Sequence, residues 1–349
     1  MKETIQIRKE YELILLVVLV KKTLNEINRV DKLLKEKIDW VEVGGILLNH
    51  RLGGYFINGL NEKQLRKIPR ELRKNLQMLV LGQKENQQSL VACIQELSNK
   101  LENEEIRYAG LKGIIFDTEI YSKGTRRSND LDILVYEEDL GKLDNLMRRL
   151  GYIQSLRPNG KLIEATKKEK MIQRLNYHDL VPYVKEGING IVEVDINFLF
   201  DGKNNIIEKK VFELGTMIYK GEEYSFRGLT YITNLAFLIS HFYREATEEL
   251  WVNNHRNLVL YKIIDIVNYI RTYNDKVNVL ELIHILNILN LIEKGLFVFY
   301  IIQEFFNNEL VKKYVDKLEE QYPEYAQKLN CDKQIFKQFF EDSFLLNRN

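Results

Sequence analysis

The sequence predicts an α+β protein in which a mixed β-sheet lies between two helical regions. Residues 1–104 repeat apolar side chains three and four positions apart, the spacing that buries one face of a helix. Residues 105–200 alternate strand-like and helix-like patterns, and from Tyr231 onward the chain is again helical. We therefore expect an N-terminal helical region (1–104), a mixed core (105–200) and a C-terminal helical domain (201–349).

Helical spacing is clearest in the N-terminal region. It occurs in three apolar runs: Ile14, Leu15, Val18 and Leu19; Leu76, Leu79 and Val80; and Leu90, Cys93, Ile94 and Leu97. The glycine-containing stretch 50–55 predicts a junction between helices. The apolar run 13–20 is too short to span a bilayer and lacks the cleavage site of a signal peptide. We expect it to form a buried helix.

Turn residues divide the mixed core. Arg107–Gly113 reads as a short strand that ends in a glycine turn, and the apolar segment Ile114–Tyr121 reads as the helix that follows. Asn159-Gly160 and Asn189-Gly190 are typical of hairpin turns. The polar segment 201–205 predicts a boundary loop.

The strongest functional signal is the pair Asp130 and Asp132, followed directly by the apolar strand Ile133–Val135. Alternate residues of a strand point to the same face, so the two carboxylates lie together. Such carboxylates repel unless a cation lies between them, and Mg²⁺ prefers oxygen ligands. This arrangement suits metal-assisted phosphoryl or nucleotidyl transfer, although Asp-x-Asp also occurs in calcium loops and solvated turns.

Residues upstream of the two aspartates favour a phosphate ligand. Gly113 begins a predicted helix, whose N-terminus attracts anions, and Lys112 adds a positive charge there. Arg126 has a planar guanidinium that can bind phosphate oxygens. Each residue alone also fits a structural interpretation, as a helix-start glycine or a solvated surface charge. Their order along the chain favours a binding site.

A third carboxylate is expected on a neighbouring strand. The segment Ile191–Ile196 alternates apolar and acidic residues, so Glu193 and Asp195 share one face. Two-metal transfer uses another acid to share a metal or to activate the attacking hydroxyl. A half-exposed strand with a polar outer face gives the same alternation.

These motifs resemble the nucleotidyltransferase superfamily, and more closely the bacterial uncharacterised nucleotidyltransferase family. The resemblance rests on Leu111-Lys112-Gly113, on Arg126-x-x-x-Asp130-x-Asp132-x-Leu134-Val135 and on Leu150-Gly151-Tyr152. It implies a nucleotidyltransferase-like mixed sheet, with Asp195 as the third acid and Glu193 in reserve. The chain departs from the superfamily in having Lys112-Gly113-Ile114 at the turn and a longer gap before Asp130.

The resemblance extends to further candidate positions. His178 falls at a strand histidine of the family, where it would orient a phosphate or an acceptor hydroxyl. Asn197 and Phe198 replace the histidine and tryptophan that the family tends to have. His241 and Asp265 fit the C-terminal helices, and Arg244 lies one helical turn after His241. The alternative for each is a structural residue, and Asp265 paired with His241 or Arg244 would simply hold two helices together.

Together, these features predict a nucleotidyltransferase dependent on Mg²⁺ or Mn²⁺ that takes an NTP as substrate. Asp130 and Asp132 would hold the metal, and Asp195 would complete the metal site or act as a base. Lys112, Gly113 and Arg126 would bind phosphates. The nucleoside monophosphate would move to a hydroxyl or phosphate of a small-molecule, peptide or protein acceptor, bound between the core and the helices after Tyr231.

Two other functions fit the same motifs. The family context of peptide and natural-product modification also admits glycosyl transfer from a nucleotide-activated sugar. A non-catalytic nucleotide-binding module is the other alternative, although such a module has no need for three acids.

Charge and cysteine content narrow the setting. Formal net charge is +1, from 51 basic and 50 acidic residues, which disfavours a nucleic-acid partner. The two cysteines are far apart and, with the scattered histidines, form no zinc spacing. They suit a reducing cytoplasm, and no membrane association is expected.

Overall fold

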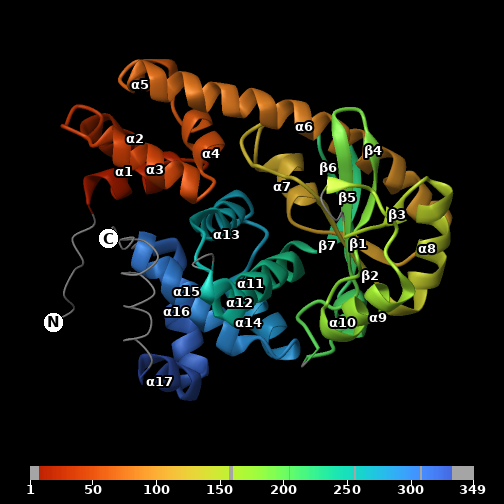
Figure 1. Ribbon diagram of the computed structural model, residues 1–349. Helices are drawn as coiled ribbons and strands as arrows, with labels where there is room; N and C mark the ends of the chain where they lie inside the picture. Colours follow the sequence, from red (N-terminus) through yellow and green to blue (C-terminus); the bar gives the residue numbers. More distant parts are fainter. Residues whose placement is uncertain (1–7, 157–159, 204, 255–256, 307–308, 332–349) are drawn as a thin grey trace.

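The structure is a computed structural model that describes residues 8–156, 160–203, 205–254, 257–306 and 309–331. Its centre is a seven-stranded sheet with strand order β3-β4-β5-β2-β1-β7-β6. In Figure 1 the C-terminal helices and the first helices of the N-terminal region lie on one side of this sheet, α8 lies on the other, and the long helix α6 runs from the first side to the second. The mixed sheet between helical segments confirms the expected α+β class.

The strands are β1 (Tyr108–Gly110), β2 (Leu131–Val135), β3 (Ile153–Gln154), β4 (Tyr183–Gly187), β5 (Gly190–Asn197), β6 (Thr216–Lys220) and β7 (Ser225–Leu229). The pairs β2–β5 and β1–β7 are parallel, and the other neighbours are antiparallel. A hairpin joins β4 to β5 where Asn189-Gly190 predicts one, with Ile188 and Asn189 in the loop. Asn159 of the other predicted turn lies outside the described residues.

The N-terminal region is helical, as expected. Its helices are α1 (Lys9–Val17), α2 (Leu24–Leu33), α3 (Trp40–Asn49), α4 (Gly53–Asn58), α5 (Glu62–Leu65) and α6 (Arg70–Asn103). The predicted junction is the short turn between α3 and α4. Helix α6 is 34 residues long, and its C-terminal half packs on the sheet through Leu90, Ile94 and Leu97.

The core and the C-terminal region contain the remaining helices. Around the sheet lie α7 (Gly113–Glu119), the 3₁₀ helix η1 (Glu137–Asp139), α8 (Leu140–Arg149), α9 (Lys167–Asn176) and α10 (Glu208–Glu213). After β7 follow α11 (Tyr231–Thr247), α12 (Glu249–Asn253), α13 (Leu260–Thr272), α14 (Val279–Ile288), α15 (Ile292–Phe306), α16 (Glu309–Gln321) and α17 (Pro323–Cys331). Within the described ranges, no helix combines the length and apolar character needed to cross a membrane.

The two faces of β2 belong to different hydrophobic cores. Leu131, Ile133 and Val135 pack with α6 and α8 in one core, whereas Leu134 joins the larger core formed with the N- and C-terminal helices. Because side chains alternate along a strand, Asp132 shares the face of Leu134. The acidic face of the sheet therefore points toward the terminal helices.

Helix α13 is fixed to the N-terminal helices by polar contacts. The Asn268 side chain accepts a hydrogen bond from the Val20 amide at 2.9 Å and donates one to the Val18 carbonyl at 3.0 Å. Arg271 pairs with Glu26 at 2.6 Å. These contacts order the helix that faces the sheet across the cavity described below.

Candidate active site

The register of β2 and β5 brings two aspartates side by side. Asp132 is the direct partner of Asp195 in this parallel pair, and Asp130 immediately precedes β2. Both positions face the same side of the sheet because the paired strands keep their alternation in step. The sequence predicted each acid from its own strand, and the pairing brings the two strands together.

The cluster of acids is electrostatically strained. Burial, followed by the charges of Asp132, Asp130 and Glu193, raises the pKa of Asp195 to about 8. Burial and Asp132 also raise the pKa of Asp130. In the described residues, the buried Oδ1 atom of Asp195 has no hydrogen-bond partner. A buried acceptor without a donor, beside two further carboxylates, fits a cationic ligand.

Lys112 occupies one side of this cluster. Its Nζ atom lies 2.7 Å from Oδ1 of Asp132, and its backbone has φ +45° at the start of α7. A non-glycine residue at positive φ costs of order 1–3 kcal/mol, so the surrounding structure must hold it there. Among the described residues, no three acid, histidine or cysteine side chains form a ready-made metal cage. A metal would therefore require these carboxylates to reorient, with Lys112 releasing Asp132.

Gly113 packs closely against neighbouring side chains, and its predicted contact with phosphate stays a prediction. It is buried and is not among the described residues that line the cavity. A Cβ atom at this position would lie 2.8 Å from Ser128 Oγ and 3.2 Å from Arg126 Nη1. The glycine is needed because these two side chains occupy the space beside it.

Arg126 is already paired within the fold. Its Nε donates to Oδ2 of Asp265 at 2.9 Å, and Nη1 donates to Ser128 at 3.0 Å. Oδ1 of Asp265 accepts hydrogen bonds from Tyr55 at 2.8 Å and Tyr121 at 2.9 Å. Part of the Arg126 guanidinium is thus already paired, and its predicted contact with phosphate stays a prediction. Asp265 pairs with Arg126 instead of the expected His241 or Arg244.

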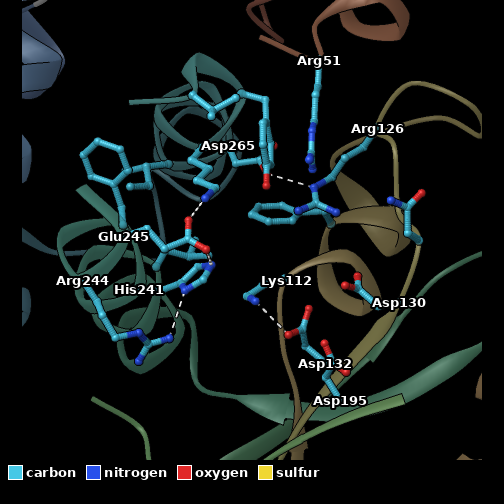
Figure 2. A pocket seen from close by; sticks show the side chains of 18 of the residues that line it. Arg51, Lys112, Arg126, Asp130, Asp132, Asp195, His241, Arg244, Glu245 and Asp265 are labelled. Carbon is cyan, nitrogen blue, oxygen red and sulfur yellow. Dashed lines mark hydrogen bonds and ion pairs between the residues drawn. The ribbon is translucent and has the colours of Figure 1, made fainter. Parts of the chain in front are cut away.

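The opposite wall of the cavity carries a chain of polar contacts from α11 and α13. Arg244 Nη2 lies 3.2 Å from His241 Nδ1, His241 Nε2 lies 3.6 Å from Glu245 Oε1, and Glu245 pairs with Lys262. Burial lowers the pKa of His241 well below its ordinary value, so the ring is neutral and Nδ1 accepts from Arg244. Figure 2 shows this chain facing Lys112 and the three aspartates.

These walls enclose a cavity of about 380 Å³ between the sheet and the C-terminal helices. The predicted site residues that line it are Lys112, Arg126, Asp130, Asp132, His178, Asp195, Asn197, His241, Arg244 and Asp265. Glu193, the reserve for Asp195, is not among the described lining residues. The fold thus gathers residues spread over much of the chain around one small-molecule-sized space.

His178 and Asn197 lie where the sheet meets α11. Burial, with the charges of Arg244 and Lys112, lowers the pKa of His178 to about 3. Asn197 is buried, and its Nδ2 atom has no hydrogen-bond partner among the described residues. A neutral imidazole and an amide donor can both exchange hydrogen bonds with a polar ligand.

Several lining residues escape prediction from the sequence. Arg51 comes from the turn between α3 and α4, Glu245 from α11, and Tyr261 and Lys262 from α13. None belongs to a local motif. The only available signal is the glycine-containing break after Arg51, which predicts a turn without indicating what the turn faces.

A second cavity of about 310 Å³ shares His178, Arg244 and Glu248 with the first. Tyr177, Lys203, Tyr243 and Lys294 are among its other lining residues. The two spaces therefore meet at the junction between the sheet and α11.

The chain matches the family described as "Uncharacterised nucleotidyltransferase" over residues 36–307. A solved structure titled "Crystal structure of an antigenic nucleotidyltransferase-like protein from Paracoccidioides brasiliensis" is 12% identical, with a TM-score of 0.31, covering 70% of this chain and 93% of that one. No curated protein matches the sequence.

The extent of the family match decides the classification. The chain belongs to the uncharacterised nucleotidyltransferase family, as its sequence motifs predict. The match includes both aspartate strands and α13, and therefore every predicted site residue.

Proposed function

We propose that this protein transfers a nucleoside monophosphate from an NTP to a hydroxyl or phosphate group of a small-molecule, peptide or protein acceptor. The observation that carries the proposal is the register of Asp132 with Asp195, beside Asp130, on the wall of a cavity. The buried Asp195 Oδ1, which has no hydrogen-bond partner within the described ranges, adds a reason for a cation at this place. Family membership supports the same class of reaction.

Asp130, Asp132 and Asp195 are the residues that would hold Mg²⁺ or Mn²⁺. When bound, the cation neutralises phosphate charge and supports in-line displacement at phosphorus. Lys112 would move from Asp132 toward the phosphates, since a metal and an ammonium compete for the same carboxylate oxygen. Asp195 would accept the proton of the acceptor hydroxyl at a carboxylate oxygen, the atom best placed to hold it.

The acceptor is proposed to bind at the junction of the two cavities. His178, Arg244 and Glu248 line both spaces, and the second cavity opens between the sheet and α11. This proposed position lies in the cleft between the core and the helices after Tyr231, where the sequence predicts the acceptor. The proposed setting is cytoplasmic, where nucleoside triphosphates and Mg²⁺ are both abundant.

Calorimetry tests the donor side of the proposal. ATP, GTP, CTP and UTP with Mg²⁺ are titrated into the wild type and into the Asp130→Ala/Asp132→Ala double variant. We expect at least one nucleotide to bind the wild type and to bind the double variant far more weakly. Equal binding by both proteins would refute the metal assignment.

Mass spectrometry of candidate acceptors tests the group transferred. A nucleoside monophosphate adds phosphorus and a larger mass than a hexose does. A hexose adduct formed from a nucleotide-activated sugar would replace the proposal with glycosyl transfer. Nucleotide binding without turnover on any acceptor would favour a non-catalytic module.

A further inference from the structure

Arg51 stands in a backbone conformation that usually selects glycine. Its φ is +56°, directly after the C-terminus of α3. The amide of Leu52 bonds to the Leu47 carbonyl at 2.8 Å, and that of Arg51 bonds to the Leu48 carbonyl at 3.3 Å. This pair of bonds is the glycine-favouring termination of a helix, so an arginine here is strained.

The side chain of Arg51 lines the cavity. Arg51 is exposed, and its guanidinium lies 5.7 Å from the ring centre of Tyr261 at the cavity. Figure 2 shows the side chain reaching toward Arg126 at the end of the cavity away from Asp132 and Asp195. In the described part of the chain, no acid pairs with this guanidinium.

Close packing fixes the turn that carries Arg51 to the core. A Cβ atom on Gly54 would collide with the carbonyl oxygens of Gly124 and Thr125. Asn58 also donates a hydrogen bond to Thr125 Oγ1 at 2.8 Å. Helix α4 therefore sits directly on the loop before Arg126, so the position of Arg51 relative to the cavity is set by contact.

Positive charge accumulates at this end of the cavity. Burial, followed by repulsion from the surrounding cations, lowers the pKa of Lys262 to about 7; these cations are Lys112, Arg51, Arg126 and Arg244. Lys262 pairs with Glu245, and Arg126 pairs with Asp265. Arg51 thus adds a guanidinium without an acid partner beside cations that already repel one another, an arrangement that an anion relieves.

We propose that Arg51 and Lys262 bind the terminal phosphates of the donor nucleotide, the part that leaves as pyrophosphate. The inference rests on the proposed function and assigns a substrate-binding residue to the N-terminal helices. In that reaction the acceptor oxygen bonds to the α-phosphorus while the bond to the bridging oxygen breaks. The electron pair stays on the bridging oxygen, the hydroxyl proton passes to Asp195, and the two cations offset the charge of the leaving group.

The test is calorimetric binding of inorganic pyrophosphate to the full chain. Arg51→Gly removes the guanidinium and suits φ +56°, so its melting temperature should equal or exceed that of the wild type. We expect pyrophosphate affinity to fall at least tenfold in Arg51→Gly, to recover partly in Arg51→Lys, and to stay unchanged for nucleoside monophosphates. Arg66→Ala, which removes an exposed charge on the turn after α5, is the matched control and should bind normally.

The outcomes separate this inference from the proposed function. Equal pyrophosphate affinity in Arg51→Gly and the wild type overturns the inference, even where nucleotide turnover persists. An absence of wild-type binding at millimolar pyrophosphate overturns it as well. Arg51-dependent binding of pyrophosphate without turnover of any NTP supports the anion site and counts against nucleotidyl transfer.

Discussion

Two ion pairs line the same cavity and differ in how completely each acid is satisfied. Asp265 receives Arg126 on one oxygen and both Tyr55 and Tyr121 on the other. Asp132 receives only Lys112 among the described hydrogen-bond donors to its side chain. The exposed side-chain fractions differ as well, at 8% and 5% for Arg126 and Asp265 and at 20% and 7% for Lys112 and Asp132.

The difference separates a structural pair from an exchangeable one. A buried pair with every acceptor filled stabilises the packing of its elements, because removing either partner leaves an uncompensated charge. A pair with unfilled acceptors beside other carboxylates can release one partner to a stronger cation. We therefore assign the Asp265 side to architecture and the Asp132 side to ligand exchange.

The largest expected effect is on turnover. Asp132→Asn should lower kcat at least 1000-fold, about 4 kcal/mol in activation free energy, because the substitution removes a carboxylate that is proposed to hold the metal. Its free energy of unfolding should change by less than about 1 kcal/mol, since lost attraction to Lys112 is offset by reduced repulsion from Asp130 and Asp195. Steady-state kinetics and urea unfolding measure the two effects. Retained turnover would place the chemistry elsewhere.

Asp265→Asn should show the opposite profile. The substitution leaves the Arg126 charge buried without its counter-ion, so we expect a loss of about 3 kcal/mol in unfolding free energy. Glu320→Gln breaks the exposed pair with Lys317 and should cost less than about 0.5 kcal/mol. If urea unfolding gave equal values for the two variants, the Arg126 pair would not have the structural role assigned to it.

The acids on the sheet were predictable because their signal is local. Asp130, Asp132 and Asp195 stand in alternating strand patterns, and any parallel pairing of these strands that kept the alternation in step would place the acids on one face. Helical spacing likewise predicted α6 and the terminal helices. These features depend on residues a few positions apart, which a single sequence contains in full.

Contacts between distant segments were not predictable. Arg126 meets Asp265 across 139 positions, and neither residue's neighbourhood indicates the other. The hairpin β6–β7 was missed because β6 alternates poorly and is buried mainly at Tyr219. Arg51 reaches the cavity only because α4 packs on the loop at Gly124 and Thr125, a tertiary contact without a local pattern.

A pH-dependent effect on stability is expected at Asp117 on α7, close to the pair of Arg126 and Asp265. Its Oδ1 atom is buried without a hydrogen-bond partner in the described residues, and burial raises the pKa of its carboxyl to about 7. Between about pH 4 and pH 7 the folded state keeps a proton that the unfolded state has released, so stability falls as pH rises through this window.

Asp117→Asn removes this pH dependence and retains an acceptor for the Gln87 amide. We expect the variant to be more stable than the wild type by about 4 kcal/mol at about pH 8 and nearly equal to it near about pH 4. Asp275→Asn, at an exposed carboxyl, is the control and should show no such trend. A stability difference independent of pH would contradict burial as the cause.

The smallest expected effect concerns the cavity wall formed by α11. It tests whether His241 on this wall is a structural residue, like Asp265, or contributes to ligand binding, as proposed for Asp132. His241 accepts from Arg244 and faces the cavity, and it also stacks on Phe237. If this wall positions the acceptor, His241→Ala should leave Mg-nucleotide affinity within about twofold and cut transfer roughly tenfold, about 1.4 kcal/mol. His241→Asn, which keeps an acceptor near Nδ1, should recover part of the loss. A fall of many degrees in melting temperature, with activity lost only in proportion to folded protein, would instead group His241 with Asp265 as a structural residue.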